Sequence, residues 1–281
     1  MSLFKTVRNA LGLLTAIEVA NLLVYHTLQG DKPQEVQIAA HRGGAALAPE
    51  NTPEAFRNAA RIGAEWIEFD LHRTSDGVLV VMHDDTVNRM TNGQGFIKDM
   101  TWEQIRALRL VNGEQVMSFA EIIAFARERN MGILPELKST DYYPGMEIQA
   151  LELVRDAGYL DKTIFLSFQW DVLENLKEAE PAARVAPLYG LYQWDLSKPL
   201  PANAEIVAPM AEMVLINPWM IQQAHAAGRQ VWVWFGPLDR PAVYRLALEL
   251  GVDGLIVNDP VAAMRIAGVD SKSLPLLKGA G

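Results

Sequence analysis

Apolar positions follow two alternating patterns from residue 36 onward. Short runs rich in Val, Ile, Phe and Trp are typical of buried strands, and the longer stretches between them have the spacing of amphipathic helices. We expect strands at residues 36–41, 66–72, 78–83, 131–138, 163–168, 183–189, 212–216, 230–235 and 254–258. We expect helices at residues 52–63, 118–130, 147–158, 170–180, 218–228 and 240–251. Several of these helices begin at a Thr or Ser cap and end at Gly or Asn, as helices commonly do.

The order of these elements predicts the fold class. The strand at 78–83 follows the strand at 66–72 after a short turn, so residues 66–83 form one strand–turn–strand excursion. About eight strand–helix units then remain, which predicts a (β/α)8 TIM barrel in the α/β class. An open, doubly wound sheet is the alternative. It is disfavoured because no glycine-rich nucleotide-binding motif follows the first strand.

A hydrophobic N-terminal helix is expected to precede the barrel. Residues 10–28 are apolar and just long enough to cross a bilayer, and positive charges precede them. Glu18 interrupts the run, so a helix packed on the domain or lying in the membrane interface is the alternative to a membrane anchor. Through residues 3–28 the protein is expected to associate with a membrane, with the barrel on the extracytoplasmic side; a cytoplasmic location is the alternative.

The expected division of the chain has three parts. Residues 1–36 form the hydrophobic segment, residues 37–270 the barrel and residues 271–281 a C-terminal tail. The net charge of −9 excludes a broad nucleic-acid-binding surface, which would need to be basic. The absence of cysteine excludes disulfides, thiolate metal ligands and a cysteine nucleophile.

Three acids fall where apolar residues would be expected at the ends of strands. Glu68 and Asp70 are two residues apart and share a strand face, and Glu136 ends a later strand. Barrel chemistry gathers at the carboxyl ends of the strands, so the three carboxylates should converge there. Such a group is suited to one hard divalent cation, Mg²⁺ or Ca²⁺. The alternative is that each acid pairs with a cation such as Arg42 or Lys138.

Two histidines are candidates for proton transfer. His41 ends the first strand and His83 ends the return strand, and imidazole titrates near neutral pH. His72 shares the strand face of the acids, but we expect it to lie beside the site rather than to bind the ion. His225 and His26 fall inside expected helices and are interpreted as packing or surface residues.

Six sequence motifs, in order, resemble those of the glycerophosphodiester phosphodiesterase family. They are HRGGAALAPENTPEAF (41–56), EFDLHRTSDGVLVVMHD (68–84), PELK (135–138), LSF (166–168), AHAAGRQVWVW (224–234) and GVDGLIVNDP (251–260). The resemblance spans about residues 37–268, nearly the whole expected barrel. It implies a metal-dependent hydrolase that cleaves a glycerophosphodiester to glycerol 3-phosphate and an alcohol.

The resemblance also implies roles for individual residues. Glu68, Asp70 and Glu136 match the metal ligands of the family, and His41 and His83 match its acid/base pair. Arg42 and Lys138 match the cations on the phosphate side. Glu50 and Asn51 match residues that brace the site or touch the ligand, and Phe168 and Trp234 lie at strand ends that face the substrate.

Three other functions remain open at this stage. One is a lysophospholipase D acting on lysophospholipids, which the hydrophobic N-terminus and several aromatic residues near the expected mouth support. These aromatic residues are Phe168, Trp170, Tyr189, Tyr192, Trp194 and Trp219. The second is a related reaction that closes a cyclic phosphate. The third is a non-catalytic binder of lipid headgroups, which is disfavoured because both histidines and all three acids are present.

Overall fold

The computed structural model describes residues 35–138, 140–190 and 204–269. Within them a nine-stranded sheet closes on itself because β1 pairs with both β2 and β9. Strand β3 (Leu79–Val81) is antiparallel to β2, and the other eight strands form a parallel barrel. The barrel strands are β1 (Gln37–Ala40), β2 (Trp66–Arg73), β4 (Gly132–Leu137), β5 (Ile164–Ser167), β6 (Arg184–Tyr189), β7 (Ile206–Pro209), β8 (Gln230–Trp234) and β9 (Gly254–Val257).

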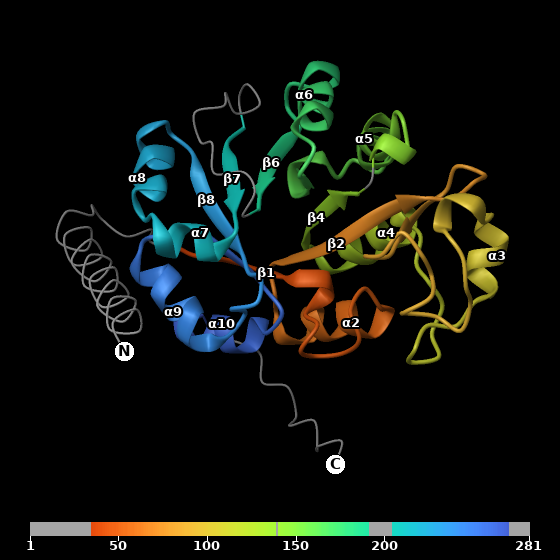
Figure 1. Ribbon diagram of the computed structural model, residues 1–281, viewed down its shortest axis with the longest axis horizontal. Coiled ribbons are helices and arrows are strands. Elements are labelled where there is room, and N and C mark those ends of the chain that lie inside the picture. The colour runs from red at the N-terminus through yellow and green to blue at the C-terminus, as the bar shows by residue number, and fades with distance from the viewer. Residues whose placement is uncertain (1–34, 139, 191–203, 270–281) are drawn as a thin grey trace, which may run out of the picture.

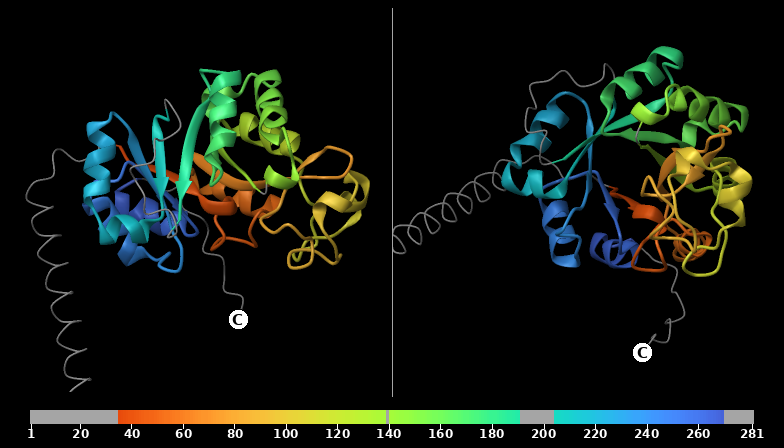
Figure 2. Two further views of the ribbon diagram at one scale, coloured as in Figure 1. Left: turned by 45° about the horizontal axis from the view of Figure 1, so that its top comes forward. Right: turned by 45° about the vertical axis from the view of Figure 1, so that its right-hand side comes forward.

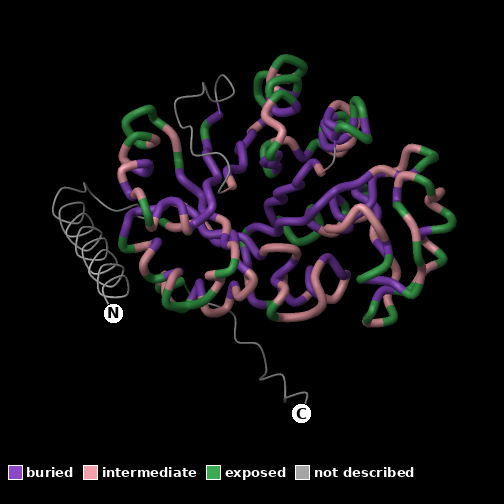
Figure 3. The backbone as a smooth tube through the Cα atoms, viewed as in Figure 1, coloured by how far each residue is buried: buried purple, intermediate pink, exposed green. Residues whose placement is uncertain are grey.

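Helices surround the barrel and cover the outer faces of its strands (Figures 1 and 2). They are α2 (Pro53–Ile62), α3 (Trp102–Ala107), α4 (Phe119–Arg129), α5 (Met146–Asp156), α6 (Trp170–Ala179), α7 (Ala211–Ile216), α8 (Trp219–Ala226), α9 (Pro241–Glu249) and α10 (Pro260–Ala267). The prediction of a (β/α)8 barrel is therefore confirmed. The buried chain follows the strands and the exposed chain lies mainly on the outer helices and loops (Figure 3).

One expected strand is wrong. Residues 212–216 lie in α7, and the sixth barrel strand is β7, just before it in the chain. Val207 of β7 pairs with Val231 of β8, and Ala208 pairs with Leu188 of β6. Two short apolar runs are adjacent here, and periodicity alone does not distinguish a short buried strand from a short buried helix.

The alternation of side chains along the strands divides the barrel into an inside and an outside. Even-numbered residues of β2 and β4 point inward, so Trp66 and Leu134 join a closed apolar cluster in the barrel interior. The same alternation places Glu68, Asp70 and Glu136 inside the barrel, toward the carboxyl ends of the strands. Register supports this placement because Asp70 lies directly opposite Glu136.

The segment between β2 and α4 forms an insertion with its own small core. Strand β3 alternates between two cores: Leu79 and Val81 pack in the main core, whereas Val80 and Met82 join a separate cluster. That cluster also contains Ile97, Ile105 and Val116, among others. In Figure 1 the insertion around α3 lies at the opposite edge of the barrel from α8.

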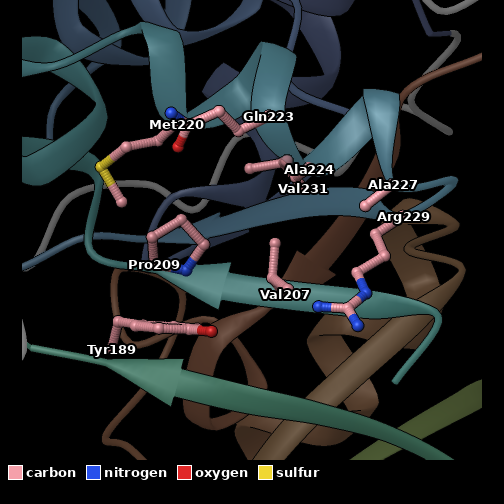
Figure 4. Close-up of a pocket in the computed structure, with 9 residues that line it drawn as sticks. All are labelled: Tyr189, Val207, Pro209, Met220, Gln223, Ala224, Ala227, Arg229 and Val231. Atoms are coloured by element: carbon pink, nitrogen blue, oxygen red, sulfur yellow. The ribbon is translucent and has the colours of Figure 1, made fainter. Parts of the chain in front are cut away.

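A groove lies on the outside of the barrel, where the described residues between β6 and β7 include no helix. Figure 4 shows this groove between β6, β7 and α8, with a volume of about 210 Å³. Tyr189, Val207 and Met220 are among its lining residues, and Arg229 is the one charged residue among the described residues that line it. The groove holds none of the acids or histidines singled out from the sequence, so it is not the candidate site.

Several expectations fall outside the described residues. This group comprises residues 1–34 of the hydrophobic segment expected at 1–36, the tail at 271–281, Tyr192 and Trp194. Across the parts of the chain that the structure describes, none of the helices has the length and apolar character needed to cross a bilayer.

Candidate active site

Three carboxylates meet at the carboxyl end of the barrel. Glu68, Asp70 and Glu136 are buried, and each offers an oxygen within 4.8 Å of the other two. Neighbouring strands carry them, with Asp70 and Glu136 at the same level. The convergence expected from the sequence is therefore present in the structure.

The electrostatics of this triad are those of a cation site. Burial raises the pKa of Glu68 well above its ordinary 4.5, and the charges of Asp70 and Glu136 raise it further. Burial also raises the pKa of Glu136 to about 7, although Lys138 opposes the shift. For Asp70, burial alone would raise the pKa, but Lys138 and Arg42 outweigh it and lower the pKa. Without a bound cation, ionising all three buried carboxylates costs free energy, because the charges are removed from water and repel one another.

The residues present fit a hard divalent cation. The Oδ1 atom of Asp70 is buried and accepts no hydrogen bond from the residues that the structure describes, so it offers an acceptor inside the triad. The three ligands are all carboxylates, the donors that Mg²⁺ and Ca²⁺ prefer. Glu68, Asp70 and Glu136 would hold such an ion.

Two cations border the triad. The Nζ of Lys138 lies 3.1 Å from Oε1 of Glu136 and 3.5 Å from Oδ1 of Asp70. The Nε of Arg42 lies 3.5 Å from Oδ2 of Asp70. The alternative in which each acid pairs with a cation therefore applies to Asp70 and Glu136. Among the described residues, Glu68 instead accepts from the backbone N–H of Arg42 at 2.7 Å and lies 3.9 Å from Nε2 of His41.

A strained turn after β1 delivers Arg42 to the site. Arg42 has a φ of 53° and Asn51 a φ of 55°, both in the left-handed region that non-glycine residues avoid. The backbone N–H of Asn51 donates to the carbonyl of Arg42 at 2.9 Å, which ties the two strained residues together. The side-chain amide of Asn51 donates to Oδ2 of Asp70 at 2.8 Å. Asn51 therefore braces a candidate metal ligand.

Gly43 allows this turn to pack closely. Its φ is 82°, and a Cβ at this position would lie 2.9 Å from both Ala55 and Phe56 of α2. A side chain here would push the turn away from α2, and Arg42 with it.

The two candidate proton-transfer histidines face the same cavity from different elements. His41 follows β1, and its Nδ1 lies 2.8 Å from Oδ1 of Asn258. His83 follows β3, and its Nδ1 lies 2.8 Å from Oδ1 of Asp84. Burial, with a further contribution from Arg42, lowers the pKa of His41 to about 4.

An ion-pair chain links the His83 side of the cavity to the turn after β1. Arg89 binds Asp84 through Nε at 2.8 Å and binds Oε1 of Glu50 through Nη2 at 2.5 Å. The same Glu50 oxygen accepts from Nη1 of Arg42 at 3.1 Å. Burial would raise the pKa of Glu50, but the hydrogen bond from Arg89 and the charge of Arg42 lower it. Glu50 therefore acts as a bridge between two arginines.

A cavity of about 400 Å³ brings the expected residues together. Its polar lining includes His41, Arg42, Glu50, Glu68, His83, Glu136, Lys138 and Asn258. Its apolar lining includes Leu166, Phe168, Leu188, Trp234, Phe235 and Ile256. Phe168 and Trp234 stack edge to face, with ring centroids 5.6 Å apart.

Other aromatic residues expected at the mouth make contacts away from the cavity. Trp170 stacks on Tyr189, and its indole N–H donates to the carbonyl of Leu188. Tyr189 lines the outer groove, and Trp219 begins α8 and packs against the main core. Of the aromatic residues named for the mouth, Phe168 is the one that lines the cavity within the described chain.

The other two histidines of the described chain have structural contacts. His72 is buried, its Nε2 lies 3.2 Å from the carbonyl of His83, and its ring packs edge to face on Tyr143. It lies beside the site and is not in the metal-binding group. His225 pairs with Asp253 at 2.8 Å on the outside of the barrel.

Sequence reasoning missed three contributors to the site. Arg89 and Asp239 lie in loops, and Phe235 follows the last residue of β8. Asn258 directly follows the last residue of β9. No spacing rule ties Asp239 to Asn258 or Arg89 to Glu50, because each pair joins different segments of the chain.

Comparisons with known proteins identify the family. A family model described as the glycerophosphoryl diester phosphodiesterase family matches residues 41–262. A glycerophosphodiester phosphodiesterase of Caldanaerobacter subterraneus subsp. tengcongensis is 32% identical over 234 residues, which cover 79% of this chain and 94% of that protein. Human glycerophosphodiester phosphodiesterase 1 is 43% identical over 121 residues, covering 40% of this chain and 37% of that protein.

Solved structures agree in fold. A glycerophosphodiester phosphodiesterase from Agrobacterium tumefaciens superposes with a TM-score of 0.69 at 29% identity, covering 81% of this chain and 99% of that one. A phosphodiesterase from Oleispira antarctica, solved with the product sn-glycerol 3-phosphate, gives a TM-score of 0.76 at 21% identity, covering 84% and 97%. The resemblance read from the six motifs is confirmed. The chain belongs to the glycerophosphoryl diester phosphodiesterase family, a family of enzymes.

Proposed function

We propose that this protein hydrolyses glycerophosphodiesters to glycerol 3-phosphate and an alcohol, with one bound divalent cation and two histidines. The observation that supports this best is that Glu68, Glu136, both histidines and both cations line one cavity at the carboxyl end of the barrel. Asp70, the third acid, lies buried beside them with an oxygen within 4.8 Å of the other two. The names of the relatives and the product bound in the Oleispira antarctica structure support the substrate class.

The residues divide the chemistry among them. A Mg²⁺ or Ca²⁺ ion held by Glu68, Asp70 and Glu136 would supply Lewis-acid stabilisation of charge on the phosphate. His41 takes a proton from the attacking group, and His83 gives one to the departing alcohol oxygen. Arg42 and Lys138 lie beside the triad, where their charges favour a phosphate.

The apolar half of the cavity supports a second candidate substrate, a lysophospholipid. Leu166, Phe168, Leu188 and Trp234 form a wall opposite the charged residues. Phe168 is 38% exposed and extends the wall to the surface. Such a wall can accept the apolar part of a lysolipid, as in a lysophospholipase D reaction.

One assay tests both substrates. The purified full chain would be supplied with Mg²⁺ or Ca²⁺ and given glycerophosphocholine, glycerophosphoethanolamine and lysophosphatidylcholine in parallel. We expect a water-soluble diester to be cleaved and a chelator to stop the reaction. Phosphorus NMR of the product separates open from cyclic phosphate. Tight binding of these compounds with no cleavage of any would instead identify a headgroup-binding protein.

We also propose that residues 3–28 associate with a membrane and that the barrel is extracytoplasmic. The support is the apolar run and the charges before it in the sequence. A flotation assay with vesicles would compare the full chain with a Leu13→Glu, Leu14→Glu variant. Equal flotation of both proteins would contradict membrane association, and protease accessibility in whole cells tests the side.

A further inference from the structure

The two ring nitrogens of His41 have different partners. Nδ1 lies 2.8 Å from the side-chain oxygen Oδ1 of Asn258, within hydrogen-bond distance. Nε2 lies 3.9 Å from Oε2 of Glu68, beyond that distance, and the ring lines the cavity. An amide oxygen only accepts hydrogen bonds, so it requires a proton on Nδ1. A neutral imidazole has one ring proton, and Nε2 is then left with a free lone pair.

We propose that Asn258 is a positioning residue that holds His41 with its proton on Nδ1, so that Nε2 is the atom that accepts the substrate-side proton. This inference rests on the proposed hydrolysis for its kinetic consequence, but the position of the proton is a property of the protein alone. The opposite orientation of the Asn258 amide would place the proton on Nε2 and leave His41 unable to act as a base there.

Three segments of the chain fix the backbone of Asn258. Its N–H donates to Oδ2 of Asp239 at 3.0 Å, and its carbonyl accepts from the N–H of Ala46 at 3.0 Å. The hydroxyl of Tyr244, on α9, donates to the other oxygen of Asp239. Asp239 comes from the loop after β8 and Ala46 from the loop after β1. Both backbone polar groups of Asn258 are therefore hydrogen-bonded, which fixes the position of the side-chain amide relative to His41.

His83 has a different kind of partner. Its Nδ1 faces Oδ1 of Asp84, and Arg89 binds both oxygens of that carboxylate. The hydrogen bond from Arg89 holds the pKa of Asp84 well below its ordinary value, so Asp84 stays ionised. A carboxylate balances the charge of an imidazolium, whereas an amide does not. The amide partner therefore favours a neutral His41 that acts as a base, and the carboxylate partner favours a protonated His83 that acts as a proton donor.

The reaction balances with these assignments. The attacking water oxygen forms a bond to phosphorus while the bond from phosphorus to the alcohol oxygen breaks. The proton lost by the water goes to Nε2 of His41, and the alcohol oxygen takes a proton from His83. Exchange with solvent returns both histidines to their starting states.

The first test measures where the proton lies, without any substrate. The full chain labelled with ¹⁵N-histidine would be studied by long-range ¹H–¹⁵N NMR, with His41→Gln used to assign the signal. We expect a neutral His41 with the proton on Nδ1 in the wild-type protein and, at about pH 8.5, in Asn258→Asp, which keeps an accepting oxygen. In Asn258→Ala we expect a mixture of tautomers. A wild-type His41 with its proton on Nε2 overturns the proposal.

The second test is kinetic. We expect Asn258→Ala to lower kcat roughly 10- to 100-fold with little change in KM, because the base is present but no longer oriented. Asn258→Asp should recover most of this loss at about pH 8.5, above the usual range of imidazole titration. The matched control is Asn175→Ala, which removes an ordinary amide hydrogen bond to Glu147 and should leave kcat unchanged.

The outcomes separate this inference from the proposed function. A wild-type protein that cleaves no diester but has the Nδ1 proton would refute the hydrolase and leave the positioning role of Asn258 standing. An active protein in which Asn258→Ala keeps its wild-type kcat refutes the positioning role. If Asn258→Ala does not fold, the wild-type tautomer and Asn258→Asp still decide the question.

Discussion

The two halves of the catalytic cavity differ in almost every respect. Strands β2 and β4 and the turns after β1 and β3 carry the charged groups, including Glu68, Glu136 and His83. Strands β5, β6 and β8 line the same cavity with apolar side chains such as Leu166 and Trp234. We infer a division of labour in which one half carries out the reaction and the other half selects the substrate.

The difference also shows how each half is stabilised. The charged half is held by a connected network in which Glu50 joins Arg42 to Arg89, so its members depend on one another. The apolar half continues the packed interior of the barrel, where each contact is worth little alone. Changes in the charged half should therefore have large effects on turnover, and changes in the apolar half should have graded effects on substrate choice.

The largest effect is expected from the acidic triad. Asp70→Asn should lower activity roughly 10⁴-fold, because it removes the charge of a metal ligand and with it the stabilisation of the phosphate. Isothermal titration calorimetry with Mg²⁺ and Ca²⁺ should show the loss of binding. Glu152→Gln, which changes an exposed carboxylate on α5, is the control. Full activity in Asp70→Asn would contradict a metal site at the triad.

Loss of a histidine should be less severe. His83→Gln should lower kcat roughly 10²- to 10³-fold while metal affinity persists, since proton donation is lost and the triad is intact. The loss should largely disappear with a diester whose leaving group is p-nitrophenol, which departs without a proton. His41→Gln should not be rescued in this way, and His225→Gln should behave as wild type. Rescue of both active-site variants would show that the two roles are assigned wrongly.

The pH dependence of metal binding tests the electrostatics of the triad. The pKa of Glu136 in the metal-free protein is raised from 4.5 to about 7, so protons compete with the metal below about pH 7. We expect affinity to fall about tenfold for each pH unit below that value. Calorimetry in buffers of different ionisation enthalpy should detect the released protons.

The same pKa shift predicts a trend in stability. A raised carboxyl pKa stabilises the metal-free fold at low pH, and this contribution is lost as the pH rises from 4.5 through about 7. The rise in Tm on adding metal should therefore increase over this range. Metal binding that does not change with pH would show that Glu136 is already ionised in the free protein.

The smallest effect is expected on the apolar half. Phe168→Ala should raise KM roughly 3- to 10-fold and leave kcat nearly unchanged, because the ring packs on Trp234 in the apolar half of the cavity. Phe96→Ala, at an exposed aromatic residue in the insertion, is the control. A fall in kcat as large as that of His83→Gln would show that the two halves do not divide the work.

Much of this site could be predicted because strand geometry is periodic. Residues two apart on a strand share a face, so Glu68 and Asp70 had to point the same way, and parallel strands end at one rim. The prediction of a strand at 212–216 was wrong because the neighbouring segment Ile206–Pro209 is also short and apolar. Which of the two segments forms the strand depends on pairing with β6 and β8.

The contacts that support Asn258 and Glu50 could not be predicted from spacing. Asp239 reaches the backbone of Asn258 only through the packing of the loop after β8, and Arg89 reaches Glu50 across 39 positions of the chain. These contacts form only when the whole barrel is folded. No local pattern encodes them.

The insertion with its own small core has a consequence for the working range of the enzyme. His83 follows a strand that shares side chains with both cores, and Asp84 and Arg89 belong to the same segment. The smaller core buries fewer apolar residues than the barrel, so on heating it should loosen first. Activity would then be lost at a temperature where the eight-stranded barrel is still folded. On cooling, only the insertion would have to refold for activity to return.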